Sequence, residues 1–585
     1  MIKKLLASVR EFKKDTLLTP VYVIFESIME IVIPTLMAYL IDYGITKRNM
    51  SFVALMGLAL VGSAVVSLAS GYLAGRSAAV ASAGFARNLR RDIFYNVQKF
   101  SFSNIDKFST GSIITRLTTD VTNVQNAYQM LIRLAVRAPM MIIFALIFSF
   151  RIDAHLSFIF VGAIPVLFTG LLLIMFHVHP IFVRVFHTYD RLNNVVQENL
   201  SGIRVVKSYI REDFEEKKFA GISQSIYDDF VRAEKRLAFN MPLMQFCLYA
   251  SMILLSWFGA KEIIASQNNP VIGLSTGGLT SLITYAMQIL MSLMMLSMVF
   301  VMMLISRASA ERIVEVLDEK SDLDNPADPV ETVADGSVIF DHVSFSYARK
   351  ADKPVLDGIN LRIGSGQTVG ILGGTGSSKS SLVQLIPRLY DVVSGRVLVG
   401  GVDVRQYDLE ALREQVAMVL QKNVLFTGTI KDNLRWGNAH ATDEELAEAC
   451  RLAQADDFIR EFPDGYDTFI EEGGTNVSGG QKQRLCIARA LLKKPKILIL
   501  DDSTSAVDTK TDSLIRQALR QSIPHTTKII IAQRVSSVQD ADQIIVLDDG
   551  GVNAVGTHEQ LLQSCDIYRE VYESQNRGGV TDAAE

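Results

Sequence analysis

The sequence predicts two fold classes joined in one chain: an α-helical polytopic membrane domain, followed by an α/β domain with a phosphate-binding loop. Long uncharged apolar runs are confined to the part of the chain before residue 306. A membrane-spanning helix needs about 20 such residues. The rest alternates short apolar strands with helices, which indicates a parallel sheet covered by helices. A chain of 585 residues also exceeds what a single hydrophobic core supports, so more than one domain is expected.

The composition argues against two classes of site. The net charge of -4 lacks the clustered basic excess of a nucleic-acid binder, so we expect no nucleic-acid partner. The four cysteines lie far apart, with neither metal-ligand nor redox spacing. We therefore expect reduced structural thiols in a cytosolic or membrane setting. These cysteines are Cys247, Cys450, Cys486 and Cys565.

Six membrane-spanning helices are predicted within residues 1–317, with long extensions into the cytoplasm. Basic residues concentrate between the second and third spans and between the fourth and fifth. By the positive-inside rule, both termini and the α/β domain are then cytoplasmic, and the protein is a multi-pass protein of the plasma or inner membrane. The predicted spans are 17–42, 52–75, 130–150, 154–178, 238–260 and 275–305.

An acidic segment with two prolines, residues 318–336, is predicted to link the membrane domain to the α/β domain at residues 337–585. In the α/β domain a glycine-rich turn lies between an apolar strand, 369–372, and a helical run, 381–390. A turn of this kind between strand and helix is typical of a P-loop. The sequence therefore predicts a phosphate-binding site at this turn.

The residues of this turn suit phosphate chemistry. Its glycines let backbone N–H groups point at phosphates, Lys379 supplies a positive charge, and the Ser380 hydroxyl can reach Mg²⁺. Ser378 stands where the usual pattern has a last glycine. A Cβ there restricts the backbone and can loosen nucleotide binding, although the N–H donor remains. The predicted phosphate-binding residues are Gly373, Gly374, Thr375, Gly376, Ser377, Ser378, Lys379, Ser380 and Ser381.

Other polar groups follow predicted strands or begin predicted helices. Tyr347 ends a strand and either stacks on adenine or packs in the core. Gln421 also ends a strand, where its amide can touch Mg²⁺ or the attacking water. Ser478–Gln481 precede a helix whose N-terminus suits a γ-phosphate. Asp501 ends the apolar strand 497–500 and is expected to hold Mg²⁺ through water.

Taken together, the six spans and these motifs resemble, over the whole chain, the multidrug-type (type IV) half-transporters of the bacterial ABC exporter superfamily. The resemblance implies an ABC nucleotide-binding domain that uses ATP and Mg²⁺. It also implies a unit of two chains, in which each ATP lies between the Walker motifs of one chain and the signature of the other. The implied motifs are the A-loop Tyr347, Walker A 373–380, the Q-loop Gln421, the signature Ser478, Gly479, Gly480 and Gln481, the Walker B Asp501, and the D-loop with Ser505 and Asp508. Coupling helices are implied near Ser109–Ile113 and Glu198–Gly202.

Besides Ser378, two positions depart from the family pattern. Asp502 stands in place of the catalytic Glu, and Gln533 in place of the switch His. The shorter side chain withdraws the carboxylate by about 1.5 Å, and a displacement of about 1 Å can cost on the order of a hundredfold in rate. Gln533 can hydrogen-bond a γ-phosphate but cannot accept a proton as imidazole does. The departures predict a site that binds ATP and hydrolyses it slowly or not at all.

A sound signature beside a degenerate catalytic pair predicts a heterodimer. This chain would lend its signature to a partner half-transporter that supplies the catalytic Glu and the switch His. A homodimer with slow ATP hydrolysis is the alternative.

The membrane domain offers two candidate features of a substrate pathway. Glu26 and Glu30 lie one turn apart in the first span, where they either attract cationic substrates or form a salt link to Arg133 or Arg137. The last span carries a stripe of methionines, which either line a promiscuous apolar pocket or pack against other helices. These are Met287, Met291, Met294, Met295, Met298, Met302 and Met303.

The expected function is ATP-driven export of amphipathic, multidrug-type small molecules through the lipid bilayer by alternating access, with the dimer as an ATP-hydrolysing translocase. An exporter of lipids or peptides is an alternative of the same class. A non-hydrolytic, ATP-gated regulatory or channel subunit is an alternative of another class, and the pair Asp502 and Gln533 permits it.

Overall fold

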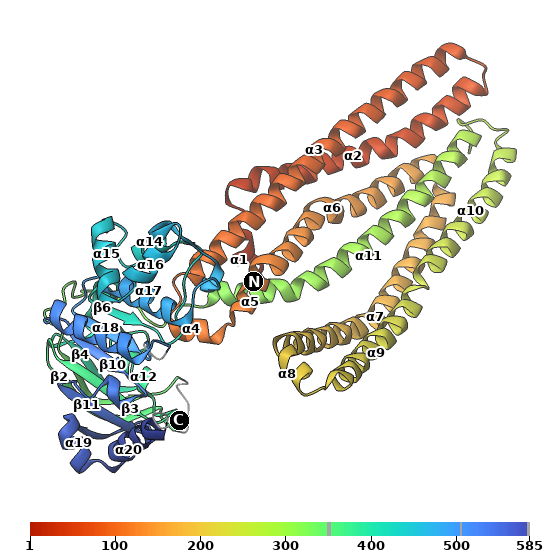
Figure 1. The fold of residues 1–585 in the computed structure, drawn as a ribbon. Coiled ribbons are helices and arrows are strands. Elements are labelled where there is room, and N and C mark those ends of the chain that lie inside the picture. Colours follow the sequence, from red (N-terminus) through yellow and green to blue (C-terminus); the bar gives the residue numbers. More distant parts are fainter. Residues whose placement is uncertain (348–352, 504–505, 582–585) are drawn as a thin grey trace. The chain divides into compact units, whose positions relative to one another are not determined.

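The computed structural model describes residues 1–347, 353–503 and 506–581. The chain separates into two compact units. The first comprises Met1–Gln98 and Thr110–Glu319, and the second Lys99–Ser109 and Lys320–Glu585. Six long apolar helices followed by a sheet-containing domain (Figure 1) confirm the fold class predicted from the sequence. The predicted boundary at residue 317 differs in one respect, because Lys99–Ser109 groups with the second unit.

Six helical stretches in the first unit are long and apolar enough to cross a membrane. They are Arg10–Ile45, Met50–Val97, Thr110–Ile152, Ala154–Ser201, Glu212–Ala265 and Thr276–Asp318, and each overlaps one predicted span. The second stretch contains 48 residues, which at about 1.5 Å per residue extend about 72 Å. A hydrocarbon core is about 30 Å thick, so this helix is more than twice as long as a crossing requires.

The helices of the first unit have the following bounds: α1 Ile2–Ala7, α2 Lys13–Tyr39, α3 Met50–Val97, α5 Thr110–Thr115, α6 Val121–Ile152, α7 Ala154–Ser201, α8 Ile203–Ser208, α9 Glu212–Leu237, α10 Asn240–Ala265 and α11 Thr276–Asp318. A short 3-10 turn, Arg10–Phe12, precedes α2, and π-helical turns, Leu40–Ile45 and Arg116–Asp120, follow α2 and precede α6.

The core of the first unit forms where apolar faces of α2, α6, α7, α10 and α11 meet. Tyr285 of α11 is fully buried there, and its hydroxyl donates to the Ile31 carbonyl of α2 at 2.9 Å. Between α6 and α7 the chain reverses at Asp153, whose extended backbone and carboxylate cap α7 by accepting from the Leu156 N–H at 2.9 Å. Packing and capping thus fix where these helices begin and which faces they bury.

The second unit is built on a six-stranded and a four-stranded sheet with covering helices (Figure 1), and β7 and β8 form a further two-stranded sheet. Its strands are β1 Val338–Phe345, β2 Leu356–Ile363, β3 Thr368–Gly373, β4 Ser394–Val399, β5 Val402–Asp403, β6 Val416–Val419, β7 Gly428–Thr429, β8 Phe469–Ile470, β9 Ile497–Asp501, β10 Thr527–Ile531, β11 Gln543–Asp548 and β12 Gly551–Gly556. Its helices are α4 Phe102–Lys107, α12 Lys379–Gln384, α13 Leu409–Gln415, α14 Ile430–Arg435, α15 Asp443–Leu452, α16 Asp456–Glu461, α17 Gly479–Leu491, α18 Thr509–Ser522, α19 His558–Ser564 and α20 Asp566–Thr581.

The larger sheet positions the nucleotide motifs. Its strand order is β12-β11-β3-β10-β9-β6, and from β11 to β6 neighbouring strands are parallel. The carboxyl ends of parallel strands lie at one edge of a sheet, where ligands bind in α/β folds. The segments that follow β3, β10, β9 and β6 carry the P-loop, Gln533, Asp502 and Gln421 respectively. The strand order therefore brings together residues that are up to 160 positions apart in the chain.

The smaller sheet, β2-β1-β4-β5, is antiparallel. It shares a buried apolar cluster with one face of the larger sheet, which includes Phe340, Leu361, Val399 and Ile499. The helical run predicted over 381–390 ends earlier, at Gln384. Arg388 then adopts a left-handed backbone with φ of 50°, which a continuing helix cannot accommodate.

Candidate functional site

The P-loop follows β3 and wraps around the side chain of Lys379. The Lys379 ammonium donates to the carbonyl oxygens of Gly373 at 2.9 Å and of Gly374 at 2.7 Å. Burial lowers the pKa of Lys379, and the carboxylates of Asp501 and Asp502 oppose that shift. The lysine is thus held inside the loop by acceptors that a phosphate oxygen could replace.

Ser378, where the family pattern has glycine, adopts a left-handed backbone with φ of 68° and ψ of 24°. This region costs a residue with a Cβ about 1–2 kcal/mol, and glycine adopts it without that cost. The loop therefore keeps the backbone geometry of a glycine at this position while it carries a serine.

Ser380 and Asp501 form the candidate metal site. The Ser380 hydroxyl donates to Asp501 Oδ1 at 2.9 Å. Burial raises the pKa of Asp501, and the hydrogen bond from Ser380 and the charge of Lys379 partly offset that shift. The described part of the chain contains no group of three or more His, Cys, Asp or Glu side chains arranged for a metal. Magnesium typically uses only one or two protein carboxylates and takes further oxygens from phosphates and water, so this oxygen pair fits Mg²⁺ bound with ATP.

Asp502 and Gln533 lie together beside this pair. The Gln533 amide donates to Asp502 Oδ2 at 3.0 Å, and the Gln421 side chain also hydrogen-bonds the Asp502 carboxylate. Burial raises the pKa of Asp502, and these amides and Lys379 work against the shift. The structure therefore brings the three residues together. The side-chain amides of Gln533 and Gln421 both hydrogen-bond the Asp502 carboxylate, which is the group that would act as the general base.

Tyr347 lies next to the P-loop helix α12. Its hydroxyl is 2.9 Å from the hydroxyl of Ser381. Its ring contacts Phe345, with centroids 4.9 Å apart, and Tyr390, with centroids 5.2 Å apart. The side chain remains 50% exposed. Tyr347 thus packs against the domain on one side and leaves the other side of its ring accessible.

The signature motif forms the N-terminus of α17. The Ser478 hydroxyl accepts from the Gln481 N–H at 3.2 Å, and the Gln481 side chain accepts from the Ser478 N–H at 2.8 Å. This reciprocal capping box fixes the start of the helix. A Cβ on Gly480 would lie 2.9 Å from the carbonyl oxygen of Ala506, which is closer than a side chain can approach. The glycine is therefore required for the contact between the signature and the D-loop.

The D-loop is described in part. Asp508 caps α18, because its carboxylate accepts from the Thr511 N–H at 2.9 Å. The Ala506 N–H donates to the side chain of Gln483 at 3.1 Å. Ser505, which the resemblance assigns to the D-loop, lies outside the described residues.

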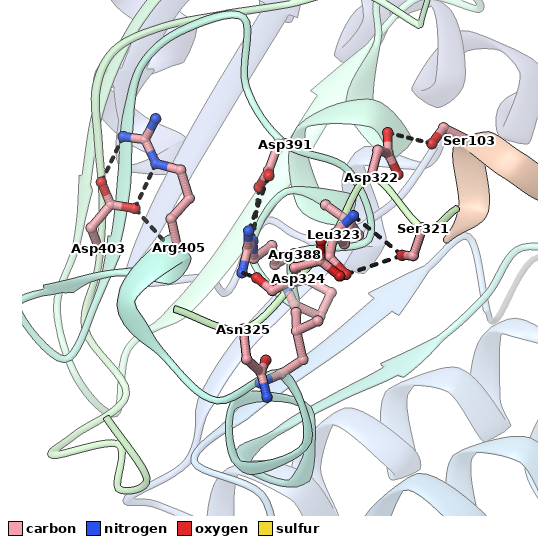
Figure 2. A network of polar contacts seen from close by, with 12 residues as sticks. Ser103, Ser321, Asp322, Leu323, Asp324, Asn325, Arg388, Asp391, Asp403 and Arg405 are labelled. Carbon is pink, nitrogen blue, oxygen red and sulfur yellow. Dashed lines mark hydrogen bonds and ion pairs between the residues drawn. The ribbon is translucent and has the colours of Figure 1, made fainter. Parts of the chain in front are cut away.

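Helix α4 carries side chains that contact the rest of the second unit. The Tyr390 hydroxyl donates to Asp106 at 2.7 Å, and the Ser103 hydroxyl donates to Asp322 at 2.7 Å. Figure 2 shows the latter contact as part of a polar network, in which Arg388 binds Asp391 and the backbone of Asp324. Helix α4 precedes the turn near Ser109–Ile113 that the resemblance implies, and that turn largely overlaps α5.

Helix α8 differs from α4 in its surroundings. It follows the second implied turn, Glu198–Gly202, and none of its residues is buried. Val205 is 59% exposed, and Ile210, just after the helix, is 84% exposed. Helix α8 thus presents apolar side chains that the described residues of this chain leave uncovered.

In the membrane unit, Glu26 and Glu30 share one arginine. Arg137 donates to Glu26 Oε1 at 2.8 Å and to the two oxygens of Glu30 at 2.6 and 2.9 Å. Of the alternatives left open by the sequence, the structure thus contains a salt link to Arg137. The second oxygen of Glu26 and the Nε of Arg133 are buried without a hydrogen-bond partner in the described residues.

The methionines of α11 avoid its buried face. The buried side of α11 is formed by Leu282, Tyr285, Ile289, Leu290 and Leu293, among others. Met287, Met291, Met298 and Met303 are exposed, and the remaining methionines of the stripe are half-buried: Met294, Met295 and Met302. The exposed methionines therefore do not serve the core of this chain.

Three residues of the site have no motif that marks them in the sequence. Gln483 binds the D-loop backbone, and Tyr390 contacts both Tyr347 and α4. Arg388 is 5% exposed and ties the linker to the nucleotide domain. A buried arginine needs partners, but nothing in the sequence says which.

Comparison with known proteins supplies a family. Residues 16–294 match the family described as ABC transporter transmembrane region, and residues 356–505 match the family described as ABC transporter. The uncharacterized ABC transporter ATP-binding protein YfiB of Bacillus subtilis is 37% identical over 550 residues, 94% of each chain. The uncharacterized ABC transporter ATP-binding protein Rv1273c of Mycobacterium tuberculosis is 35% identical over 578 residues, 97% of each chain. A fatty acid ABC transporter ATP-binding/permease protein of Mycobacterium bovis is 32% identical over 483 residues, 83% of this chain and 75% of the relative.

Proposed function

This chain belongs to the ABC transporter family as a half-transporter, and from that premise we propose that it is the degenerate-site subunit of a heterodimeric, ATP-driven exporter. The observation that carries the proposal is the hydrogen bond from Gln533 to Asp502. These two residues stand at the positions where the family resemblance expects a switch His and a catalytic Glu. Neither an amide nor a shortened, hydrogen-bonded carboxylate is a good general base in that place.

The chain's own site binds ATP and Mg²⁺ without cleaving ATP efficiently. Lys379 and the P-loop N–H groups hold the phosphates, and Ser380 and Asp501 hold the metal ion. Asp502 is one methylene shorter than glutamate, so its carboxylate lies about 1.5 Å short of the position a glutamate reaches. Bound Mg²⁺ would supply charge stabilisation for the phosphate groups. We therefore assign this site to binding and regulation.

The signature of the same chain completes the catalytic site of a partner. Ser478 and Gln481 cap α17 reciprocally, so the N-terminus of this 13-residue helix is well defined. Helix N-termini bind anions through free N–H groups and the helix dipole. A partner with a catalytic Glu and a switch His would place its γ-phosphate against this end of α17. The exposed apolar surface of α8 also favours a second chain.

The expected cycle couples this dimer to the membrane. Both termini lie on the cytoplasmic side of a plasma or inner membrane. ATP closes the two nucleotide domains, and the turns near Ser109–Ile113, after α4, and Glu198–Gly202, before α8, transmit the movement. The membrane helices then change from inward to outward access, and hydrolysis at the partner's site resets the dimer.

The substrate class that fits the membrane unit best is an amphipathic small molecule. The exposed methionines of α11 offer a flexible, polarisable surface for varied apolar groups. Glu26 and Glu30 are carboxylates within a membrane helix that share Arg137, and ionisable groups at such depth usually mark a substrate pathway, so we assign them to the attraction of cationic substrates.

The substrate assignment is tested by the double variant Glu26→Gln and Glu30→Gln, assayed for transport of one cationic and one neutral amphipathic dye. We expect transport of the cationic dye to fall more than that of the neutral dye. Equal loss for both dyes would contradict a role for the carboxylates in substrate charge and would leave them as structural partners of Arg137.

Export of a fatty acid or another lipid is a second candidate, favoured by the similarity to the fatty acid ABC transporter of Mycobacterium bovis. Uptake of labelled fatty acid and of dye into inside-out vesicles distinguishes the two candidates. The same assay tests an ATP-gated channel, because a pump builds a gradient while a channel only dissipates one.

The heterodimer itself is tested by purification of the chain from its native membrane and mass spectrometry of the polypeptide bound to it. We expect a second half-transporter with Glu after its Walker B Asp and with a switch His. A purified homodimer with full, substrate-stimulated ATP turnover would contradict the proposal.

A further inference from the structure

The C-terminal helix α20 reaches the segment that carries Gln533. The Gln575 side chain accepts a hydrogen bond from the Val535 N–H at 2.8 Å and donates one to the Gln533 carbonyl at 2.8 Å. One amide thus pairs with a backbone donor and a backbone acceptor two residues apart, in the manner of a neighbouring β-strand. The side-chain amide of Gln or Asn suits such a pair, because it carries a donor and an acceptor side by side, as a peptide group does.

The helix that presents Gln575 is firmly attached to its domain. Tyr568 of α20 is fully buried, and its hydroxyl lies 2.6 Å from His558 Nδ1 at the start of α19. The rings of His558 and Tyr572 pack with centroids 5.2 Å apart. Because α20 is fixed in this way, Gln575 extends from a rigid base toward the Gln533 segment.

The Gln533 segment is also held on its other sides. The Ala532 N–H donates to the Ile371 carbonyl of β3 at 3.2 Å, and Val535 is buried. Ser537 donates to Asp512 of α18 at 3.0 Å. Between these contacts, Gln575 donates to the backbone carbonyl of Gln533, and the Gln533 side chain donates to Asp502. A continuous path of hydrogen bonds therefore runs from α20 through Gln533 to Asp502.

From this path we propose that Gln575 is a positioning residue that sets where the Gln533 side chain lies, and that α20 thereby controls how well this site distinguishes ATP from ADP. The proposal rests on the proposed function, in which Gln533 stands at the position of the switch His, and it assigns to the Gln533 amide a hydrogen bond to the γ-phosphate. ADP lacks that phosphate, so a misplaced Gln533 weakens ATP binding and leaves ADP binding unchanged.

The test uses the full-length purified chain in nanodiscs and the variant Gln575→Ala, with Asn576→Ala as the matched control. Asn576 is the neighbouring amide of α20, and it is exposed and makes no hydrogen bond among the described residues. Hydrogen–deuterium exchange of the peptide around Val535 reports positioning directly. Loss of one hydrogen bond should make this exchange about threefold to tenfold faster in Gln575→Ala, and Asn576→Ala should match the unmodified chain.

The second readout is the ratio of ATP to ADP affinity, measured with fluorescent analogues of the two nucleotides. We expect Gln575→Ala to lower this ratio severalfold through ATP binding alone, and Gln575→Glu, which keeps only the acceptor, to give an intermediate ratio. In a Gln533→Ala background, Gln575→Ala should cause no further change, since the residue through which it acts is gone.

Two outcomes would overturn the proposal. Exchange at Val535 that is equally slow in Gln575→Ala and the unmodified chain would show that Gln575 does not hold the segment. An equal loss of ATP and ADP affinity would indicate a general structural defect. If Gln533→Ala leaves the ratio of ATP to ADP affinity unchanged, Gln533 does not contact the γ-phosphate. Faster exchange at Val535 in Gln575→Ala would then still support the positioning role of Gln575.

Discussion

The P-loop and the pair formed by Asp502 and Gln533 lie at the same sheet edge, yet they differ in chemical completeness. In the P-loop, Lys379 makes hydrogen bonds to two carbonyl groups, and Ser380 reaches Asp501 at 2.9 Å. At the pair, a carboxylate one methylene too short accepts a hydrogen bond from an amide that has no basic nitrogen. In the proposed function, the P-loop binds the nucleotide and the pair determines how fast it is cleaved, so binding and cleavage depend on separate residues.

We expect the largest effect when the family's catalytic Glu and switch His are restored in this chain. The double variant Asp502→Glu with Gln533→His returns the carboxylate to its full reach and supplies an imidazole. We expect ATP hydrolysis at this site to rise on the order of a hundredfold, because a displacement of about 1 Å costs about that factor. Steady-state phosphate release from the purified chain measures the effect.

A matched control carries the same two substitutions away from the site. Asp464→Glu with Gln521→His changes an exposed Asp before β8 and an exposed Gln near the end of α18, and should leave phosphate release unchanged. If the restored pair hydrolyses ATP no faster than this control, the site is limited by something other than these two side chains, and the comparison fails.

The variant Lys379→Ala tests the proposed role of the P-loop in nucleotide binding. The substitution removes a charged donor to phosphate, which is worth about 1.5–3 kcal/mol, so ATP affinity should fall roughly 10- to 150-fold. Isothermal titration with a non-hydrolysable ATP analogue measures it. Lys510→Ala, an exposed lysine of α18, is the control, and equal affinities for the two variants would contradict the assignment of the P-loop.

The smallest effect is expected at Ser378, whose left-handed backbone carries a Cβ. Ser378→Gly removes a strain of about 1–2 kcal/mol from the left-handed conformation. ATP affinity rises only by the part of this strain that is present in the nucleotide-bound loop and absent from the nucleotide-free loop. We expect ATP binding to tighten by at most about fivefold. Ser378→Ala keeps the Cβ and should give no gain. Weaker ATP binding by Ser378→Gly would show that the Ser378 side chain contributes to nucleotide binding.

The sequence predicted the fold class, and the structure brings the residues of the predicted nucleotide site to one sheet edge, because both results depend on local signals. Apolar runs of sufficient length predict membrane helices, and polar residues after parallel strands gather at one sheet edge whatever lies between them in the chain. This is why Gln421, Asp501 and Gln533 could be assigned to one site before their strand order was known.

Contacts without a local signal could not be predicted. Arg133 and Arg137 lie one turn apart on the same helix, so helical spacing alone could not choose which of them binds Glu26 and Glu30. The end of α12 at Gln384 was missed because residues 385–390 continue an apolar helical pattern. The grouping of α4 with the second unit depends on Tyr390 and Asp106, 284 positions apart.

The most direct test of the account traps the product of hydrolysis. The complex of this chain with its partner is incubated with photoreactive radiolabelled ATP and vanadate, irradiated, and each chain is digested to find the label. The account predicts vanadate-dependent label in the partner's Walker A pocket and none in the pocket around Lys379. Trapped nucleotide in the Lys379 pocket would contradict the central claim, because it would show that this site completes the hydrolysis it is proposed to lack.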